Sequence, residues 1–180
     1  MHTEKTLNRL IQKISSRKVV LFSLSAFVLV LVIVNLFFKK NFAFLTQTFN
    51  YSPEDVYQLL ENIGESGRSQ HLLVFFPDVL MVLLYSILLI GANYSIFNHF
   101  VKRCSLISVI TFSPLLLSFV QLLEIALLAM ILLKYPSQFI YLAKFANVIT
   151  MAKTLLTVIF FSMPLVGLCI INMRKIVKRV

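Results

Sequence analysis

The sequence predicts an all-α, polytopic integral membrane protein with four transmembrane helices, and three observations lead to this fold class. The chain of 180 residues is 59% apolar and 13% charged, whereas soluble domains are about half apolar and about a quarter charged. Its apolar residues collect in four runs, each close to or above the ~20 residues that cross a bilayer. Its basic residues flank these runs mainly on one side. We therefore expect a single membrane domain over residues 1–180.

The predicted spans cover residues 19–38, 72–97, 104–133 and 146–172. The loop 39–71 contains a short amphipathic helix at residues 53–63. Its start is marked by Ser52 as the N-cap, by Pro53 at the first helical position and by acids in the first turn, and Gly64 ends it. Because its apolar stripe must rest on lipid or on the ends of the spans, this helix is either a lid or a surface cap.

The distribution of charge predicts the orientation in the membrane. Eleven of the 17 Lys and Arg residues lie in the N-terminal segment 1–18, the connection at 102–103 and the tail 173–180. An even number of spans puts these regions on one side, which the positive-inside rule makes the cytoplasm. We expect a plasma membrane, in particular a bacterial inner membrane, with both termini cytoplasmic. The same distribution explains the charge of +10 as a topology signal and argues against a nucleic-acid partner.

The N-terminal segment 1–18 has the pattern of a basic amphipathic helix. Leucine and isoleucine recur on one face, and lysine and arginine recur every four residues on the other. Such a helix would lie on the inner leaflet and bind anionic lipids, although a basic flank that only sets orientation has the same pattern. The expected partners are therefore the lipid bilayer and anionic inner-leaflet lipids, with a homodimer or another membrane protein as further alternatives.

Three ionisable side chains, Asp78, Glu124 and Lys153, lie inside three different spans at a similar depth in the outer half. A charge there is costly unless it is paired or faces a cavity, so such residues often mark functional sites. Each has polar neighbours at helical spacing, and lipid would not tolerate these polar stripes outward. The predicted ligand-binding or functional cluster comprises Asp78, Tyr85, Gln121, Glu124, Thr150 and Lys153, with Arg68 near its mouth. Two carboxylates meet one ammonium, so the charges do not cancel.

Two further patterns bear on this site. Pro114 and Pro164 predict kinks in the third and fourth spans, and Ser113 is placed to satisfy a backbone group that Pro114 frees. The three histidines are too scattered for a metal site, and we expect no cofactor.

The chain resembles a group of small bacterial four-span membrane proteins without an assigned activity. The resemblance rests on Gly64-x-x-Gly67-Arg68, on Asp78 followed by Tyr85, on Glu124 and on Lys153, and it covers residues 51–153. Two positions depart from the pattern of that group: Gln121 replaces an aspartate and Ile125 replaces an asparagine. The resemblance supports this choice of residues and implies no substrate.

These features leave three functions open. The first is binding or transport of a small molecule or ion through the outer-half polar site, and transport would need a homodimer. The second is an intramembrane enzyme acting on a lipid or isoprenoid, with Glu124 or Asp78 as the general acid or base. The third is an accessory subunit of a membrane complex. A polar network that only holds the helices together would produce the same pattern.

Overall fold

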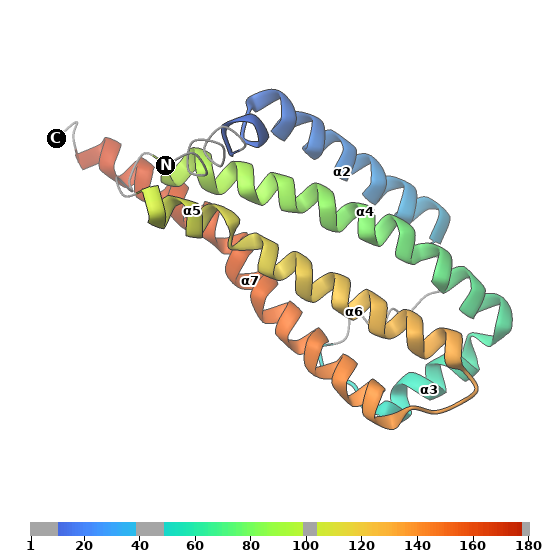
Figure 1. Cartoon of the computed structure of the whole chain (residues 1–180). Coiled ribbons are helices and arrows are strands. Elements are labelled where there is room, and N and C mark those ends of the chain that lie inside the picture. The colour runs from blue at the N-terminus through green and yellow to red at the C-terminus, as the bar shows by residue number, and fades with distance from the viewer. Residues whose placement is uncertain (1–10, 39–48, 99–103, 178–180) are drawn as a thin grey trace, which may run out of the picture. The chain divides into compact units, whose positions relative to one another are not determined.

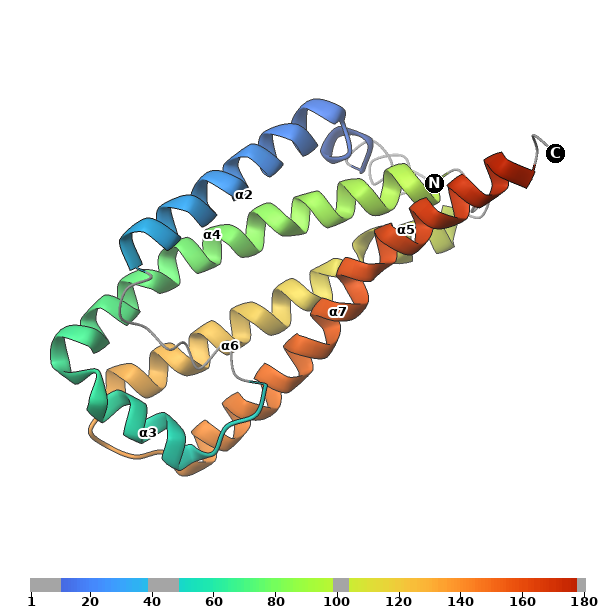
Figure 2. The ribbon, with the colours of Figure 1, turned by 180° about the vertical axis from the view of Figure 1, so that it is seen from behind.

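The computed structural model describes residues 11–38, 49–98 and 104–177, and every regular element within these ranges is a helix. The helices are α2 (Arg17–Phe38), α3 (Pro53–Asn62), α4 (Gly64–Phe97), α5 (Cys104–Phe112), α6 (Pro114–Lys134) and α7 (Ile140–Val177), shown in Figures 1 and 2. Four stretches in the described ranges, Arg17–Leu36, Gly64–Phe97, Leu106–Lys134 and Ile140–Met173, are long and apolar enough to cross a membrane. The predicted all-α class with four spans is confirmed, and these helices fit a multi-pass membrane protein.

Two helices begin earlier than the predicted spans. α4 begins at Gly64 instead of residue 72, and α7 begins at Ile140 instead of residue 146. Hydropathy marks where a helix becomes apolar, whereas a helix begins at its turn and capping residues. The polar residues 64–71 therefore belong to α4, and residues 140–145, which include Lys144, belong to α7.

The N-terminal segment is described only in part. Residues 11–14 are helical and a turn at Ser15 and Ser16 separates them from α2, so the helix predicted in the segment 1–18 is interrupted there. Residues 1–10 of the basic amphipathic segment, residues 39–48 of the loop and residues 178–180 of the basic tail lie outside the described ranges.

The third span is broken at Ser113, between α5 and α6. Pro114 has no backbone N–H, so it cannot donate to the carbonyl oxygen of Ile110 one turn earlier. That oxygen instead accepts hydrogen bonds from Ser113 Oγ at 2.9 Å and from Asn93 Nδ2 of α4 at 3.2 Å. The predicted role of Ser113 is thereby confirmed, and Asn93 adds a second donor from another helix.

A capping box starts α3. The backbone N–H of Asp55 donates to Ser52 Oγ at 3.1 Å, and the backbone N–H of Ser52 donates to Asp55 Oδ2 at 2.7 Å. Asp55 itself is exposed, and these hydrogen bonds lower the pKa of its carboxyl below the ordinary value. At the other end Gly64 has φ +65°, a left-handed conformation that favours glycine, and α4 starts there. α3 and α4 are therefore joined with almost no loop.

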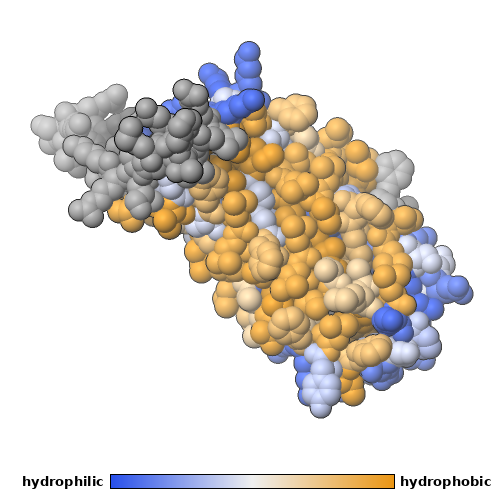
Figure 3. All heavy atoms as spheres, in the orientation of Figure 1, coloured by the Kyte–Doolittle hydropathy of each residue, from blue (hydrophilic) through white to orange (hydrophobic). Residues whose placement is uncertain are grey.

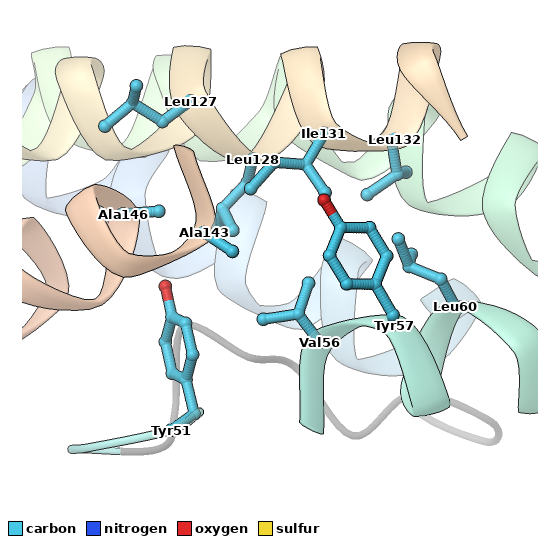
Figure 4. Close-up of a cluster of buried hydrophobic side chains, with 10 residues drawn as sticks. All are labelled: Tyr51, Val56, Tyr57, Leu60, Leu127, Leu128, Ile131, Leu132, Ala143 and Ala146. Atoms are coloured by element: carbon cyan, nitrogen blue, oxygen red, sulfur yellow. The ribbon is translucent and has the colours of Figure 1, made fainter. Parts of the chain in front are cut away.

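The apolar face of α3 packs on α6 and α7, and Figures 1 and 2 show α3 across the ends of these helices. Val56 and Leu60 are 0% and 1% exposed, and removing each from water contributes roughly 1.5–3 kcal/mol. In Figure 4 their cluster combines residues from the segment before α3, from α3, from α6 and from α7. The buried members are Tyr51, Val56, Tyr57, Leu60, Leu127, Leu128, Ile131, Leu132, Ala143 and Ala146.

Contacts divide the chain into two compact units. One comprises residues 28–83 and 118–155 and contains α3, and we call it the α3 unit; the other comprises residues 1–27, 84–117 and 156–180. On the face drawn in Figure 3, apolar side chains cover α6 and α7, and hydrophilic side chains gather around α3. Apolar side chains also dominate the exposed surface of α2. Such surfaces suit helices whose solvent is lipid.

Candidate functional site: a buried ion pair beneath Tyr51

Glu124 of α6 and Lys153 of α7 form a buried ion pair in the α3 unit. Lys153 Nζ lies 2.8 Å from Glu124 Oε2 and donates a hydrogen bond of 2.9 Å to Glu124 Oε1. The exposed fraction is 1% for the Glu124 side chain and 10% for that of Lys153. An unpaired charge in such surroundings would be strongly unfavourable, whereas a pair with good hydrogen bonds is tolerated. The ionisable residues of the third and fourth spans therefore meet directly.

Thr150 adds a hydroxyl donor to Glu124. Its Oγ1 lies 2.6 Å from Glu124 Oε1, 3.0 Å from the carbonyl oxygen of Ala146 and 3.2 Å from the hydroxyl oxygen of Tyr51. A threonine hydroxyl has one hydrogen, and the ionised carboxylate and the carbonyl can only accept. The hydrogen between the two hydroxyls must therefore come from Tyr51. Donation runs in one direction, from Tyr51 through Thr150 to Glu124.

Tyr51 is held over this pair by its own backbone and by its neighbours. Its N–H donates to Asn147 Oδ1 at 3.2 Å, and Asn147 Nδ2 donates to Asn50 Oδ1 at 2.8 Å. Figure 4 shows the Tyr51 hydroxyl directed toward α7 beside Ala146. Burial raises the pKa of the Tyr51 hydroxyl and outweighs the hydrogen bond with Thr150, which lowers it. The hydroxyl therefore keeps its hydrogen at neutral pH and remains a donor.

Asp78 contributes a second carboxylate from α4. It is half-buried, and its charge interacts with those of Lys153 and Glu124. Within the described part of the chain, no hydrogen bond or ion pair joins Asp78 to another residue. Glu124 thus contacts the ammonium of Lys153 directly, whereas Asp78 interacts with this ammonium through charge alone.

Arg68 lies at the end of α3 instead of at the ion pair. Its Nη1 donates to the carbonyl oxygen of Leu60 at 2.9 Å, and its guanidinium stacks over the ring of Tyr135 at 4.4 Å. A cation over an aromatic face contributes ~0.5–1 kcal/mol at exposed sites. These contacts tie the start of α4 to the end of α3 and to the segment that follows α6.

The remaining two predicted members lie on α6 and α4. Gln121 is half-buried on α6, three residues before Glu124. Tyr85 is buried in the other unit, where its ring packs against Phe161 with a centroid distance of 5.9 Å. The structure therefore brings together Glu124, Thr150 and Lys153 and sets Asp78 within range of their charges.

The sequence-based prediction did not include Tyr51 or Asn147 in the cluster. The helical spacing of polar residues could have identified Asn147, because it lies three residues before Thr150 and extends the polar stripe of α7 by one turn. Tyr51 had no such signal. It comes from a loop 99 positions away from Thr150, and only the packing of α3 brings it to the site.

A groove of about 240 Å³ lies beside α3. Its lining residues include Glu54, Tyr57, Glu61 and Tyr135. Neither Glu124 nor Lys153 lines it.

Across the described ranges, no three His, Cys, Asp or Glu side chains are arranged to hold a metal ion. Comparison of the chain with protein-family models, with curated proteins and with solved structures finds no match. Function must therefore be inferred from the ion pair and its neighbours.

Proposed function

We propose that the chain is a multi-pass protein of a bacterial plasma membrane with both termini in the cytoplasm. The support is the concentration of Lys and Arg in the two terminal segments and at residues 102–103. In this orientation α3 lies on the outer surface. Glu124 and Lys153 then lie in the outer half of the bilayer, beneath Tyr51.

We further propose that the protein binds a small molecule or ion at this outer-half site, and that the ligand is a singly charged cation. The observation that carries this proposal is the charge of the cluster. In their ionised forms Glu124 and Asp78 carry two negative charges, and Lys153 carries one positive charge. An uncompensated charge in apolar surroundings is unfavourable, so an occupant with one positive charge balances the site. A proton, an alkali cation and a small ammonium ion all satisfy this requirement.

Transport would build on the same binding site. Four spans are few for a pathway through a monomer, so transport would require a second copy of the chain. A lipid-modifying enzyme and an accessory subunit are the alternatives. Each predicts a different result from the cation-binding proposal in the experiment below.

The test measures thermal unfolding of the full chain in lipid nanodiscs. Sodium, potassium, ammonium and methylammonium replace N-methyl-glucamine at constant ionic strength, and pH is varied separately. We expect at least one cation, the proton included, to raise the unfolding midpoint in a saturable way, because a ligand at 100 times its Kd adds about 2.7 kcal/mol. Asp78→Asn should lose this response, whereas Glu61→Gln on the exposed surface of α3 should keep it.

The proposal fails if no cation, at any pH, separates the wild-type chain from Asp78→Asn. A midpoint that responds to added lipid or to a partner protein and to no cation would favour the enzyme or the accessory subunit instead.

A further inference from the structure

We propose that the groove beside α3 binds a linear aliphatic amine that carries an ammonium group at each end. The groove has a volume of about 240 Å³, below the roughly 300–1,000 Å³ of pockets for drug-sized ligands, so its occupant is small or slender. This site is separate from the outer-half cluster, because neither Glu124 nor Lys153 lines it. The inference therefore stands independently of the proposed function.

One wall of the groove is a single face of α3. Its lining residues Glu54, Tyr57, Gln58 and Glu61 follow the spacing i, i+3, i+4 and i+7, which brings them to the same side of the helix. A glutamate lies at each end of this row, two helical turns apart, which corresponds to about 10.5 Å along the helix axis. Both glutamates are exposed, and the Tyr57 side chain between them is 6% exposed. This wall therefore presents two separated carboxylates with an aromatic ring between them.

The opposite wall comes from the segment between α6 and α7 and from the first residue of α7. Tyr135, Gln138 and Ile140 line it. The ring of Tyr135 already attracts a cation, because the Arg68 guanidinium lies 4.4 Å from its centroid. Arg68 is not among the described lining residues, and none of those residues is Lys, Arg or His. The described lining of the groove is therefore acidic and aromatic, which favours a cationic occupant.

Two contacts hold the walls in position. The hydroxyl oxygen of Tyr57 accepts a hydrogen bond of 2.6 Å from the backbone N–H of Phe139, which joins α3 to the opposite wall. Arg68 donates to the carbonyl oxygen of Leu60 in α3 and stacks on Tyr135 in the opposite wall. Because both walls are fixed in this way, a ligand does not have to order them when it binds.

The two carboxylates are available to a ligand. In the part of the chain that the structure describes, neither the Glu54 nor the Glu61 side chain forms a hydrogen bond or an ion pair. An ammonium group has three N–H donors, and its hydrogen bonds to a carboxylate are stronger than those between neutral groups. One ammonium group at each end of the row therefore satisfies both glutamates.

The separation of the glutamates selects the length of the amine. An extended chain advances roughly 1.2 Å per bond, so about nine bonds cover the two turns between Glu54 and Glu61. Diaminooctane and spermidine have this length, whereas diaminobutane is much shorter. The methylene chain between the ammonium groups can lie against the rings of Tyr57 and Tyr135, which line opposite walls.

The test measures equilibrium binding of amines to the full chain in nanodiscs of a zwitterionic lipid. Isothermal titration calorimetry compares diaminooctane with diaminobutane, which has the same charge, and empty nanodiscs provide the blank. We expect diaminooctane to bind at least about twofold more tightly, because only the longer diamine reaches both carboxylates and one exposed ion pair has an effect of this size. Binding should weaken as the salt concentration rises.

Three glutamate variants locate the site. Glu54→Gln and Glu61→Gln each remove one carboxylate and keep the size of the side chain. Each should lower the affinity for diaminooctane about two- to fivefold and should abolish the preference over diaminobutane, because only one ammonium group can then be paired. Glu65→Gln is the matched control, since it removes an exposed carboxylate in the first turn of α4 that does not line the groove. It should retain the preference for the longer diamine.

Two variants at Tyr135 test the aromatic wall. Tyr135→Leu removes the ring, so we expect it to lower the affinity for diaminooctane about two- to fivefold. Tyr135→Phe keeps the ring and should keep the affinity. The thermal unfolding midpoint of each variant shows whether it is folded.

Three outcomes would contradict binding in the groove. The first is equal affinity of the wild-type chain for the two diamines. The second is the same loss of affinity in Glu65→Gln as in Glu54→Gln and Glu61→Gln, which would indicate a general effect of surface charge. The third is diamine binding that is lost in Asp78→Asn and kept in Glu54→Gln and Glu61→Gln, which would place the amine at the outer-half cluster. The response to sodium and potassium described above tests that cluster separately.

Discussion

Asn93 Nδ2 donates a hydrogen bond of 3.2 Å to the carbonyl oxygen of Ile110, the acceptor that lost its helical donor to Pro114. The two residues lie on different helices, α4 and α5. Asn93 is 0% exposed, so the bond forms away from solvent. A break in one span is thus stabilised by a side chain of its neighbour, as expected where lipid cannot supply a donor.

The contribution of this bond should depend on the proline. Pro114→Ala restores a backbone N–H that can reach Ile110, so the Asn93 donor becomes redundant. We expect Asn93→Ala to lower the free energy of unfolding more in the wild-type chain than in the Pro114→Ala variant. The expected coupling energy is ~0.6 kcal/mol, the average for interhelical hydrogen bonds in membranes. A double-mutant cycle on the free energy of unfolding in mixed micelles measures it.

Ser162→Ala serves as the matched control for that cycle. Ser162 Oγ donates to the carbonyl oxygen of Ile159 at 2.9 Å, a side-chain bond to a helix backbone away from Pro114. Ser162→Ala should lower the free energy of unfolding by the same amount in the wild-type chain and in the Pro114→Ala variant. Equal costs for Asn93→Ala in the two backgrounds would contradict the assigned role of Asn93.

Removing one member of the Glu124 and Lys153 pair should be worse than removing both. Glu124→Leu leaves a buried ammonium and Lys153→Met leaves a buried carboxylate, so each should lower the free energy of unfolding by roughly 3–5 kcal/mol. The double variant replaces the pair by apolar side chains and should recover a large part of this loss. Unfolding in mixed micelles at neutral pH provides the comparison.

The same three variants separate a structural role from a functional one. The double variant should be folded and should show a weaker cation response than the wild-type chain in the nanodisc experiment, because Asp78 still carries a negative charge but Glu124 no longer contributes its oxygens. A double variant as unstable as the two single changes combined would show that the residues do not act as a pair.

Tyr57 should control the start of α7. Its hydroxyl oxygen accepts a hydrogen bond of 2.6 Å from the backbone N–H of Phe139, the residue that precedes α7. Tyr57→Phe removes this acceptor, and we expect a loss of about 1 kcal/mol in local stability. Hydrogen exchange should become faster at Phe139 and should be unchanged at the centre of α7. Unaltered exchange at Phe139 would contradict the assignment.

The capping of α3 should weaken in acid through Asp55. The folded pKa of Asp55 lies below its ordinary value because the carboxylate accepts hydrogen bonds at Ser52. Its contribution is therefore fully present above the ordinary carboxyl pKa of about 4, and it is lost as the pH falls through the lower folded value. Amide protection in α3, corrected for the intrinsic exchange rate, should fall over this window.

Asp55→Asn should remove that pH dependence, because an amide oxygen still accepts from Ser52 but does not titrate there. Glu54→Gln, in the same turn, should leave it in place. Identical acid profiles for the wild-type chain and Asp55→Asn would contradict this origin of the dependence.

The sequence was informative wherever a local pattern carried the structure. Helical spacing and depth were enough to expect that Glu124 and Lys153 face each other, because lipid penalises a charge on the outer surface of a span. The start of α3 followed from Ser52 and Asp55, whose roles lie within one turn. The rescue of the backbone at Pro114 by Ser113 was local in the same way.

Relationships between distant segments could not be read from these patterns. Tyr51 reaches Thr150 only because α3 packs on α6 and α7, and no spacing rule links a loop to a helix 99 positions away. Arg68 was expected near the mouth of the site. In the structure the carbonyl of Leu60 and the ring of Tyr135 hold it elsewhere. Tyr85 shares a helical face with Asp78 but belongs to the other compact unit.

The short connection between α6 and α7 affects how this protein is made. α6 ends at Lys134 and α7 begins at Ile140, so Glu124 and Lys153 belong to one helical hairpin. Inserting a lone charge at the centre of a span costs about 2.5–3.5 kcal/mol at the translocon. A hairpin that enters as a unit presents the two opposite charges to each other before either helix meets lipid. We therefore expect stable membrane insertion of α6 to require synthesis of the chain as far as Lys153.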